Sequence, residues 1–402
     1  MRVEGAAVPI FGGIDSAITH YMRTTGTRAA SVSVTRQDRL AYSRSFTWAE
    51  PSYPLTTVAS MFRIASMSKP LTAMAVLRLV EEGLINLDAA IIPALALAPP
   101  PGRTVVPQAT TITVRQLLAH SSGLGDVPDA YQVVQAYGTM LPARERQVAG
   151  LALSTPLNFM PGTAKGYSNA GYLVLGLLIE HVTGETYENA VRRLVLSPLG
   201  ITRAHLTATR RADQRPGAVR HHAGGMGQLD LSLGPSAIEE WAVTMPWPRP
   251  HLVRFGRPLA ANAYGGGDYG FFDAFGAWCL ASADFARVLA SFERAPNPLF
   301  NAASVAAMTT PVVIPGFTGW EAPFGLGWYV TNNAGDTMFG HGGNLGGMKP
   351  GGTRSSAGWS VTALQNSDAG GLTNIVEAAL RAVPLGSWPA TDSWASAQLP
   401  AW

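Results

Sequence analysis

The sequence predicts an α/β protein in which strands from both ends of the chain enclose a mainly helical middle. The first observation is a pair of alternating segments, residues 31–36 and 39–46, which flank a polar turn and predict a β-hairpin. The second is a set of strand-like segments after residue 320, and the third is a series of apolar segments with helical spacing between them.

Residues 66–83 follow the hairpin and predict a helix. Pro70 is tolerated in its first turn, and Gly83 is a suitable C-terminal stop. The intervening residues are apolar on almost every side until the end of the segment. We therefore expect a helix that is buried around most of its circumference and provides a rigid support for a catalytic group.

The remaining elements follow from the same patterns. We expect a loop at residues 91–102, a short helix and turn at 114–124, and helices at 171–184 and 185–200. We expect strands at residues 324–330, 337–343 and 359–366, and a closing helix at 372–383. These elements predict a discontinuous sheet domain at 15–83 and 270–395, an inserted, mostly helical domain at 84–269, and an active site between them.

Composition restricts the class of protein. The 402 residues are 47% hydrophobic and 14% charged, which fits a folded chain with a large core and excludes a disordered one. A net charge of +3 without any run of basic residues argues against nucleic acid as a partner. We find neither a signal-peptide pattern nor an apolar segment of membrane-spanning length, so we expect a soluble, cytoplasmic protein without a membrane partner.

Several residues favour a structural interpretation over a chemical one. The single cysteine, Cys279, lies in an apolar segment and is expected to be a small buried side chain. His221 and His222 are adjacent but lack a matching cluster of ligands, so we expect a solvated loop and no metal site. Aromatic residues between about 215 and 275 either line a substrate pocket or pack in the core; they include Trp241, Trp247, Tyr264, Phe271 and Phe272.

Ser66 and Lys69 form the first candidate catalytic pair. Their spacing on a helix places a hydroxyl group beside an amine. A serine becomes a nucleophile when a neighbour takes its proton, and a lysine can do so when burial lowers its pKa. The chain contains only three lysines, and this one begins an apolar helix where a surface charge has no structural reason to be. Arginine, whose pKa exceeds about 12, would not serve as a base.

A second candidate element is the segment Tyr167-Ser168-Asn169, which leads from a glycine-rich loop into an apolar helix. A tyrosine phenol can transfer protons if nearby cations favour the phenolate, and an asparagine amide can donate to a substrate carbonyl. We therefore expect Tyr167 to face a cleft and Asn169 to bind substrate.

The third candidate element is the segment 340–343, where His341 stands among glycines at the end of a predicted strand. Glycines at such a place let a substrate approach backbone N–H groups that can form an oxyanion hole.

Taken together, these elements resemble the serine β-lactamase and penicillin-binding-protein superfamily, in its class C β-lactamase, DD-peptidase and family VIII carboxylesterase branch. The resemblance extends from about residue 15 to about residue 380. It rests on the order and spacing of the segments FRIASMSKPLTAMAVLRLVEEGLINLD, VRQLLAHSSGL, PGTAKGYSNAGYLVLGLLIEHVTGETYENAV, PLGI, SADFARVL, FGLGWYV and GHGG. It implies the family fold, an antiparallel sheet flanked by helices with a mostly helical insertion.

The resemblance also implies roles for individual residues. Ser66 would be the acylated nucleophile, Lys69 its base and Tyr167 the second proton-transfer group. Asn169 would contact the acyl group, and the backbone N–H groups of Ser66 and Asn344 would form the oxyanion hole.

One departure from the family pattern concerns the substrate. Penicillin-recognising members usually have Lys-Thr-Gly where this chain has His341-Gly342-Gly343, so the cation and hydroxyl that help bind a substrate carboxylate are missing. Gly342 and Gly343 would still border the substrate, and His341 would donate to Tyr167 or to the ester. The segment 346–354, which follows the triplet, is also richer in glycine and proline than is usual. β-Lactamase or D-amino-acid peptidase activity is therefore less expected than esterase activity.

The sequence thus predicts a serine hydrolase that forms a covalent acyl-enzyme, most simply a carboxylesterase acting on a small-molecule ester or amide without a cofactor. The alternative is an acyltransferase that passes the acyl group from Ser66 to an amine or alcohol of a small metabolite. An inactive binding relative is the least expected, and the sequence leaves the oligomeric state open.

Overall fold

The computed structural model describes the chain apart from residues 141–142, 209–212, 222–268, 318–322, 334 and 401–402. His222 and three of the aromatic residues considered above lie outside the described residues; these are Trp241, Trp247 and Tyr264.

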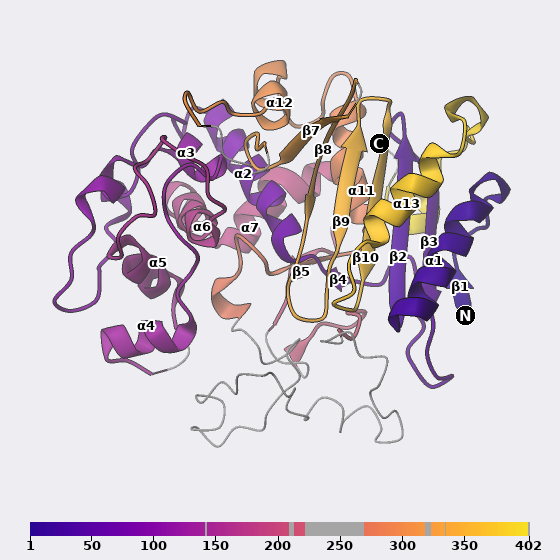
Figure 1. Cartoon of the computed structure of the whole chain (residues 1–402), viewed down its shortest axis with the longest axis horizontal. Helices are drawn as coiled ribbons and strands as arrows, with labels where there is room; N and C mark the ends of the chain where they lie inside the picture. The colour runs from indigo at the N-terminus through magenta and orange to yellow at the C-terminus, as the bar shows by residue number, and fades with distance from the viewer. Residues whose placement is uncertain (141–142, 209–212, 222–268, 318–322, 334, 401–402) are drawn as a thin grey trace.

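The centre of the fold is an antiparallel sheet of seven strands in the spatial order β1-β3-β2-β10-β9-β8-β7. The strands are β1 (Arg2–Glu4), β2 (Ala29–Arg36), β3 (Arg39–Thr47), β7 (Tyr329–Asn333), β8 (Asp336–Gly342), β9 (Gly351–Ser355) and β10 (Trp359–Gln365). β2 pairs with β10, so the two ends of the chain meet in the middle of the sheet (Figure 1). The predicted fold class is confirmed, although β1, which precedes residue 15, was not predicted.

Helices cover both faces of this sheet. α1 (Gly12–Thr25) and α13 (Leu372–Arg381) lie on one face, and α11 (Ser282–Ala290) lies on the other (Figure 1). Successive side chains of β2 point to opposite faces of the sheet, which explains this arrangement. Val32 and Val34 belong to the apolar core under α1 and α13. Ser31 and Ser33 face the opposite way, and each hydroxyl lies 2.8 Å from that of Ser282.

The helical part lies beside the β7 edge of the sheet (Figure 1). It contains α2 (Ser68–Glu81), α3 (Val114–Leu118), α4 (Ala130–Tyr137), α5 (Glu145–Leu153), α6 (Asn169–Thr183), α7 (Tyr187–Val191) and α12 (Ala302–Thr309). α2 is buried on almost every side and packs against α6 and α7. A second, small sheet joins the two parts; its strands are β4 (Phe62–Arg63), β5 (His205–Leu206) and β6 (Trp278–Leu280).

Three local predictions differ from the structure. Only the end of the segment 324–330 belongs to a strand, because Gly327 has a left-handed φ of 91° and lies directly against Ala73 of α2, where no side chain fits. The helix expected at 185–200 ends at Val191 and continues as a π-helical turn over Arg192–Leu196. His221 is buried instead of solvated, and its Nε2 accepts a hydrogen bond from the Arg63 N–H at 3.3 Å.

Two further observations concern the described residues alone. Cys279 is a free, buried thiol on β6. Within the part of the chain that the structure describes, no helix has the length and apolar character needed to cross a bilayer, and no three His, Cys, Asp or Glu side chains gather as a metal site would require.

Candidate active site

Ser66 lies in a single 3-10 turn, η2 (Ala65–Met67), between β4 and α2. The preceding residue, Ala65, has a φ of 48°, in the left-handed region that costs a residue with a side chain about 1–2 kcal/mol. Backbone strain of this kind clusters at active sites, where the surrounding structure maintains it. Here it turns the chain sharply from β4 into the buried helix and brings Ser66 to the start of α2.

Lys69 is completely buried in the first turn of α2. Its Nζ lies 3.1 Å from Ser66 Oγ, 2.7 Å from Asn169 Oδ1 and 3.0 Å from the carbonyl oxygen of Phe275. Burial holds the pKa of Lys69 well below its usual value, and the charge of Asp126 opposes this effect only in part. The amine therefore has both the position and the reduced basicity that a base for Ser66 needs.

Tyr167 lies in the loop that leads into α6, with its ring against Lys69. The lysine Nζ is 4.7 Å from the ring centroid, and the phenol forms a hydrogen bond with Ser66 that lowers its pKa. Burial outweighs this bond and raises the pKa of Tyr167 well above 10. Tyr167 therefore keeps its phenol proton near neutral pH, and the phenolate considered in the sequence analysis is not favoured, because burial has the larger effect on the pKa of Tyr167.

His120 supports Tyr167 and was not singled out from the sequence. Its ring stacks on that of Tyr167 with 4.5 Å between centroids, and its Nδ1 accepts a hydrogen bond from the Ser168 N–H at 3.1 Å. Burial lowers the pKa of His120 well below 6.5, so the ring is neutral. In the sequence His120 stands in the segment 114–124, just after an apolar helix. No catalytic motif surrounds it there, so the sequence alone does not single it out.

Asn169 is the first residue of α6, and Ser168 caps this helix by accepting from the Gly171 N–H at 2.9 Å. The side chain of Asn169 connects Lys69 with Asp126. Its Oδ1 accepts from Lys69, and its Nδ2 donates to Asp126 Oδ1 at 2.7 Å. The structure thus adds Asp126 to the site, which the sequence analysis had missed because a single acidic residue in a loop carries no pattern.

The end of β8 brings the glycine segment against the turn that contains Ser66. A Cβ at Gly343 would lie 2.6 Å from the Ile64 carbonyl oxygen and 2.9 Å from Ala65 Cβ, so only glycine fits there. The Gly343 N–H is already used, donating to the Pro350 carbonyl at 2.8 Å. Gly342 and Gly343 therefore border the serine turn, and Asn344 follows directly; its N–H as an oxyanion donor stays a prediction.

His341 lies within β8 and is buried. Its Nδ1 is 2.6 Å from the Gly342 carbonyl oxygen, whereas Nε2 has no hydrogen-bond partner among the residues that the structure describes. Burial, reinforced by the charge of Lys69, lowers the pKa of His341 to about 3. The ring lies near Tyr167, with 6.4 Å between centroids, but the predicted hydrogen bond from His341 to Tyr167 is not among those present.

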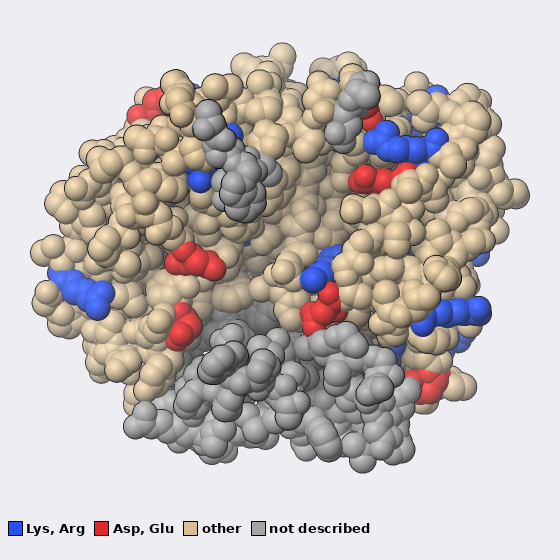
Figure 2. Space-filling view, viewed as in Figure 1, with Lys and Arg blue, Asp and Glu red and all other residues tan. Residues whose placement is uncertain are grey.

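The surface of this face of the molecule is hollowed between the helical part and the sheet (Figure 2). Most of the surface in and around the hollow is neither acidic nor basic, with a few charged side chains at its margins. Such a surface suits a small substrate better than a polyanion.

Comparison with known proteins agrees with the fold. The family model described as Beta-lactamase matches residues 14–383, which is most of the chain. The chain belongs to the beta-lactamase family. Within this family it is 29% identical over 288 residues to the esterase EstB of Burkholderia gladioli, a match that covers 66% of this chain and 67% of EstB. It is 28% identical over 190 residues to penicillin-binding protein 4* of Bacillus subtilis, covering 46% of this chain and 39% of that protein.

Solved structures show the same beta-lactamase fold at lower identity. The penicillin-binding protein homologue from Pyrococcus abyssi has a TM-score of 0.69 at 22% identity, covering 92% of this chain and 76% of its own. The D-amino acid amidase from Ochrobactrum anthropi has a TM-score of 0.68 at 18% identity, and the match covers 93% of this chain and 99% of the amidase chain. The chain is therefore a serine hydrolase of the beta-lactamase family, whose enzymes act on small molecules.

Proposed function

We propose that this protein hydrolyses esters of small carboxylic acids through an acyl-enzyme on Ser66. The observation that carries the proposal is the 3.1 Å contact between Ser66 Oγ and the fully buried amine of Lys69. Burial favours the uncharged amine, which can accept the serine proton as Oγ attacks.

The reaction proceeds in two acyl transfers. In the first, a bond forms between Ser66 Oγ and the ester carbonyl carbon, and the serine proton passes to Lys69. The bond between that carbon and the alkoxy oxygen then breaks, and the alcohol leaves with a proton delivered through Tyr167. In the second, water attacks the acyl carbon and gives up a proton to the same groups. The bond between that carbon and Ser66 Oγ then breaks, the serine oxygen takes the proton back, and the carboxylic acid is released.

Charge develops on the carbonyl oxygen during both steps. We assign its stabilisation to the backbone N–H groups of Ser66 and Asn344, since the Gly343 N–H is engaged with Pro350. The close approach of Gly343 to Ala65 supports this assignment, because it brings the backbone around Asn344 close to the backbone of Ser66. The neutral ring of His341 lies 6.4 Å from that of Tyr167, centroid to centroid, and can contact the ester without carrying charge.

Two observations favour an ester over a β-lactam as the substrate. The triplet His341-Gly342-Gly343 offers neither a cation nor a hydroxyl for the carboxylate of a β-lactam. The similarity to EstB, named as an esterase, extends over two thirds of both chains.

The test is to trap the acyl-enzyme with a panel of activated esters and to measure the mass of the intact protein by mass spectrometry. We expect a mass increase equal to the acyl group, absent from Ser66→Ala, followed by release of free acid. No adduct with any ester would contradict the proposal. Amine or alcohol acceptors added in parallel distinguish hydrolysis from acyl transfer, because a transferase would release the acyl group as an amide or a new ester.

A further inference from the structure

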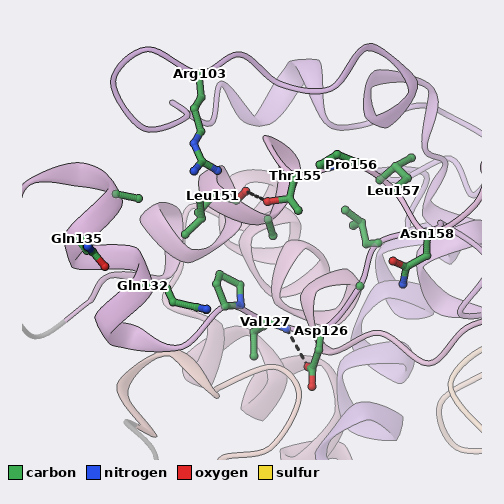
Figure 3. Close-up of a pocket in the computed structure, with 15 residues that line it drawn as sticks. Arg103, Asp126, Val127, Gln132, Gln135, Leu151, Thr155, Pro156, Leu157 and Asn158 are labelled. Atoms are coloured by element: carbon green, nitrogen blue, oxygen red, sulfur yellow. Dashed lines mark hydrogen bonds between the residues drawn. The ribbon is translucent and has the colours of Figure 1, made fainter. Parts of the chain in front are cut away.

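A pocket of about 710 Å³ lies in the helical part of the molecule (Figure 3). Its walls come from the loop that follows α3, from α4, from α5 and the segment after it, and from Arg103 in a loop that precedes α3. They include Leu124, Asp126, Gln132 and Asn158. We call this cavity the Asp126 pocket. Its volume is in the range of cavities that hold small-molecule ligands. Neither the nucleophile nor its base lines this pocket, so the catalytic steps above do not use it.

Asp126 connects the pocket with the catalytic residues. Its Oδ1 accepts two hydrogen bonds, from Asn169 Nδ2 at 2.7 Å and from the Val127 N–H at 2.8 Å. Because the other end of the Asn169 amide is bound to Lys69, the carboxylate lies one amide group away from the catalytic amine. The loop is held there by the Gly125 carbonyl, which accepts from Ser168 Oγ at 2.8 Å.

The second carboxylate oxygen of Asp126 remains available to a ligand. Oδ2 has no hydrogen-bond or ion-pair partner within the described ranges, and the side chain is exposed. In Figure 3, Asp126 lies at one side of the pocket while Arg103 reaches in from the other. The Arg103 side chain likewise has no ion-pair or hydrogen-bond partner among the residues described. The pocket therefore presents a negative end next to the catalytic residues and a positive end away from them.

This polarity restricts what the pocket can bind. A carboxylate close to the reacting carbonyl repels an anionic substrate group and disfavours the oxyanion that forms during acylation. A cationic group on the substrate would relieve both effects by pairing with Asp126 Oδ2. The catalytic residues alone give no reason for a free carboxylate oxygen at this position.

We propose that the Asp126 pocket binds a protonated amino group on the acyl part of the substrate, so that the preferred esters are those of amino acids. This inference rests on the proposed esterase function and names its substrate class. The amides of Gln132 and Asn158 and the guanidinium of Arg103 also line the pocket and are available to the side chain of such an amino acid.

A purely structural role for Asp126 makes a different prediction. In that case the carboxylate only orients Asn169 and influences Lys69, and its loss would slow all esters alike. Asp126→Asn separates the two roles, because an asparagine oxygen can still accept from Asn169 Nδ2 while the charge is lost. Asp129→Asn is the matched control: it removes a charge three residues away, outside the pocket lining, and keeps the N-cap of α4.

The kinetic experiment compares two isosteric esters, valine methyl ester in both enantiomers and methyl 2,3-dimethylbutanoate, in which a methyl group replaces the ammonium. It is run near pH 6.5, where an α-amino group with a pKa of about 7.7–8.0 is protonated. The measured quantity is the ratio of kcat/KM for the cationic ester to that for the neutral one. We expect Asp126→Asn to lower this ratio roughly tenfold and Asp129→Asn to leave it unchanged. An unchanged ratio in Asp126→Asn would overturn the inference, even if both rates fell.

A binding experiment keeps the inference testable if no ester is turned over. Ser66→Ala and the double variant with Asp126→Asn are titrated by calorimetry with the same esters. We expect Ser66→Ala to bind the valine ester more tightly than the neutral ester, and the double variant to lose this preference. Equal binding of the two esters by Ser66→Ala would refute ammonium recognition. Absence of any Ser66-dependent hydrolysis would refute only the esterase proposal.

Discussion

Replacing Lys69 with methionine tests the proposed base most directly. Methionine has a similar length and fills the buried space in α2, but it cannot take the Ser66 proton. Loss of a positioned general base typically costs 10²–10⁴ in rate, or about 3–5 kcal/mol of transition-state stabilisation. The same change leaves Asn169 Oδ1 and the Phe275 carbonyl without their donor, which costs about 1–3 kcal/mol of stability for each buried acceptor.

The assay is the single-turnover rate of acylation by an activated ester, followed by intact mass at a temperature well below the melting point of each variant. Lys69→Arg is the matched control, since it keeps a donor and a charge but stays protonated. We expect both variants to acylate at least a hundredfold more slowly than the wild type. If either variant acylated within about threefold of the wild-type rate, Lys69 would not be the base.

Other predictions concern pH and packing. Acylation should decline as pH falls through the lowered pKa of Lys69. His341→Asn should keep a decline that occurs above about pH 4, because His341, with a pKa of about 3, is already neutral there. Thermal stability should decrease as the pH is lowered from 6.5 towards 3, because the imidazole of His341 takes up a proton in the unfolded chain but not in the folded one. In melting curves, His341→Asn should weaken this dependence on pH. Gly343→Ala should lose about 1–3 kcal/mol of stability in denaturant titrations, since its Cβ would lie 2.6 Å from the Ile64 carbonyl oxygen. Gly342→Ala should fold normally, its Cβ meeting nothing closer than Pro350 at 3.8 Å. His120→Phe should retain stacking on Tyr167 yet lose the Ser168 bond, lowering kcat more than it raises KM.

The sequence predicted the elements that have a strong local pattern. The hairpin around Gln37 and the buried helix after Ser66 both follow from periodicity, and the structure contains them as β2, β3 and α2. The segment 324–330 was expected to be a strand because its composition is apolar and aromatic. The close packing of Gly327 against Ala73 decides its conformation, and such a long-range contact leaves no local pattern.

The candidate site likewise contains some residues that the sequence indicated and others that only the fold brings there. Ser66 and Lys69 are neighbours in sequence, and the scarcity of lysine made the second of them conspicuous. His120 and Asp126 reach the site only through the fold, by stacking on Tyr167 and by bonding to Asn169. The protonation of Tyr167 was also beyond the sequence, because it depends mainly on burial, which only the fold determines.

The central claim is that Ser66 carries the acyl group during turnover. It is tested most directly by quenching the enzyme during reaction with an activated ester, digesting it and locating the added mass by peptide sequencing in the mass spectrometer. The account predicts that the acyl group resides on the peptide containing Ser66, and that Ser66→Ala carries none and releases no acid above background. An acyl group on any other residue, or undiminished hydrolysis by Ser66→Ala, would contradict it.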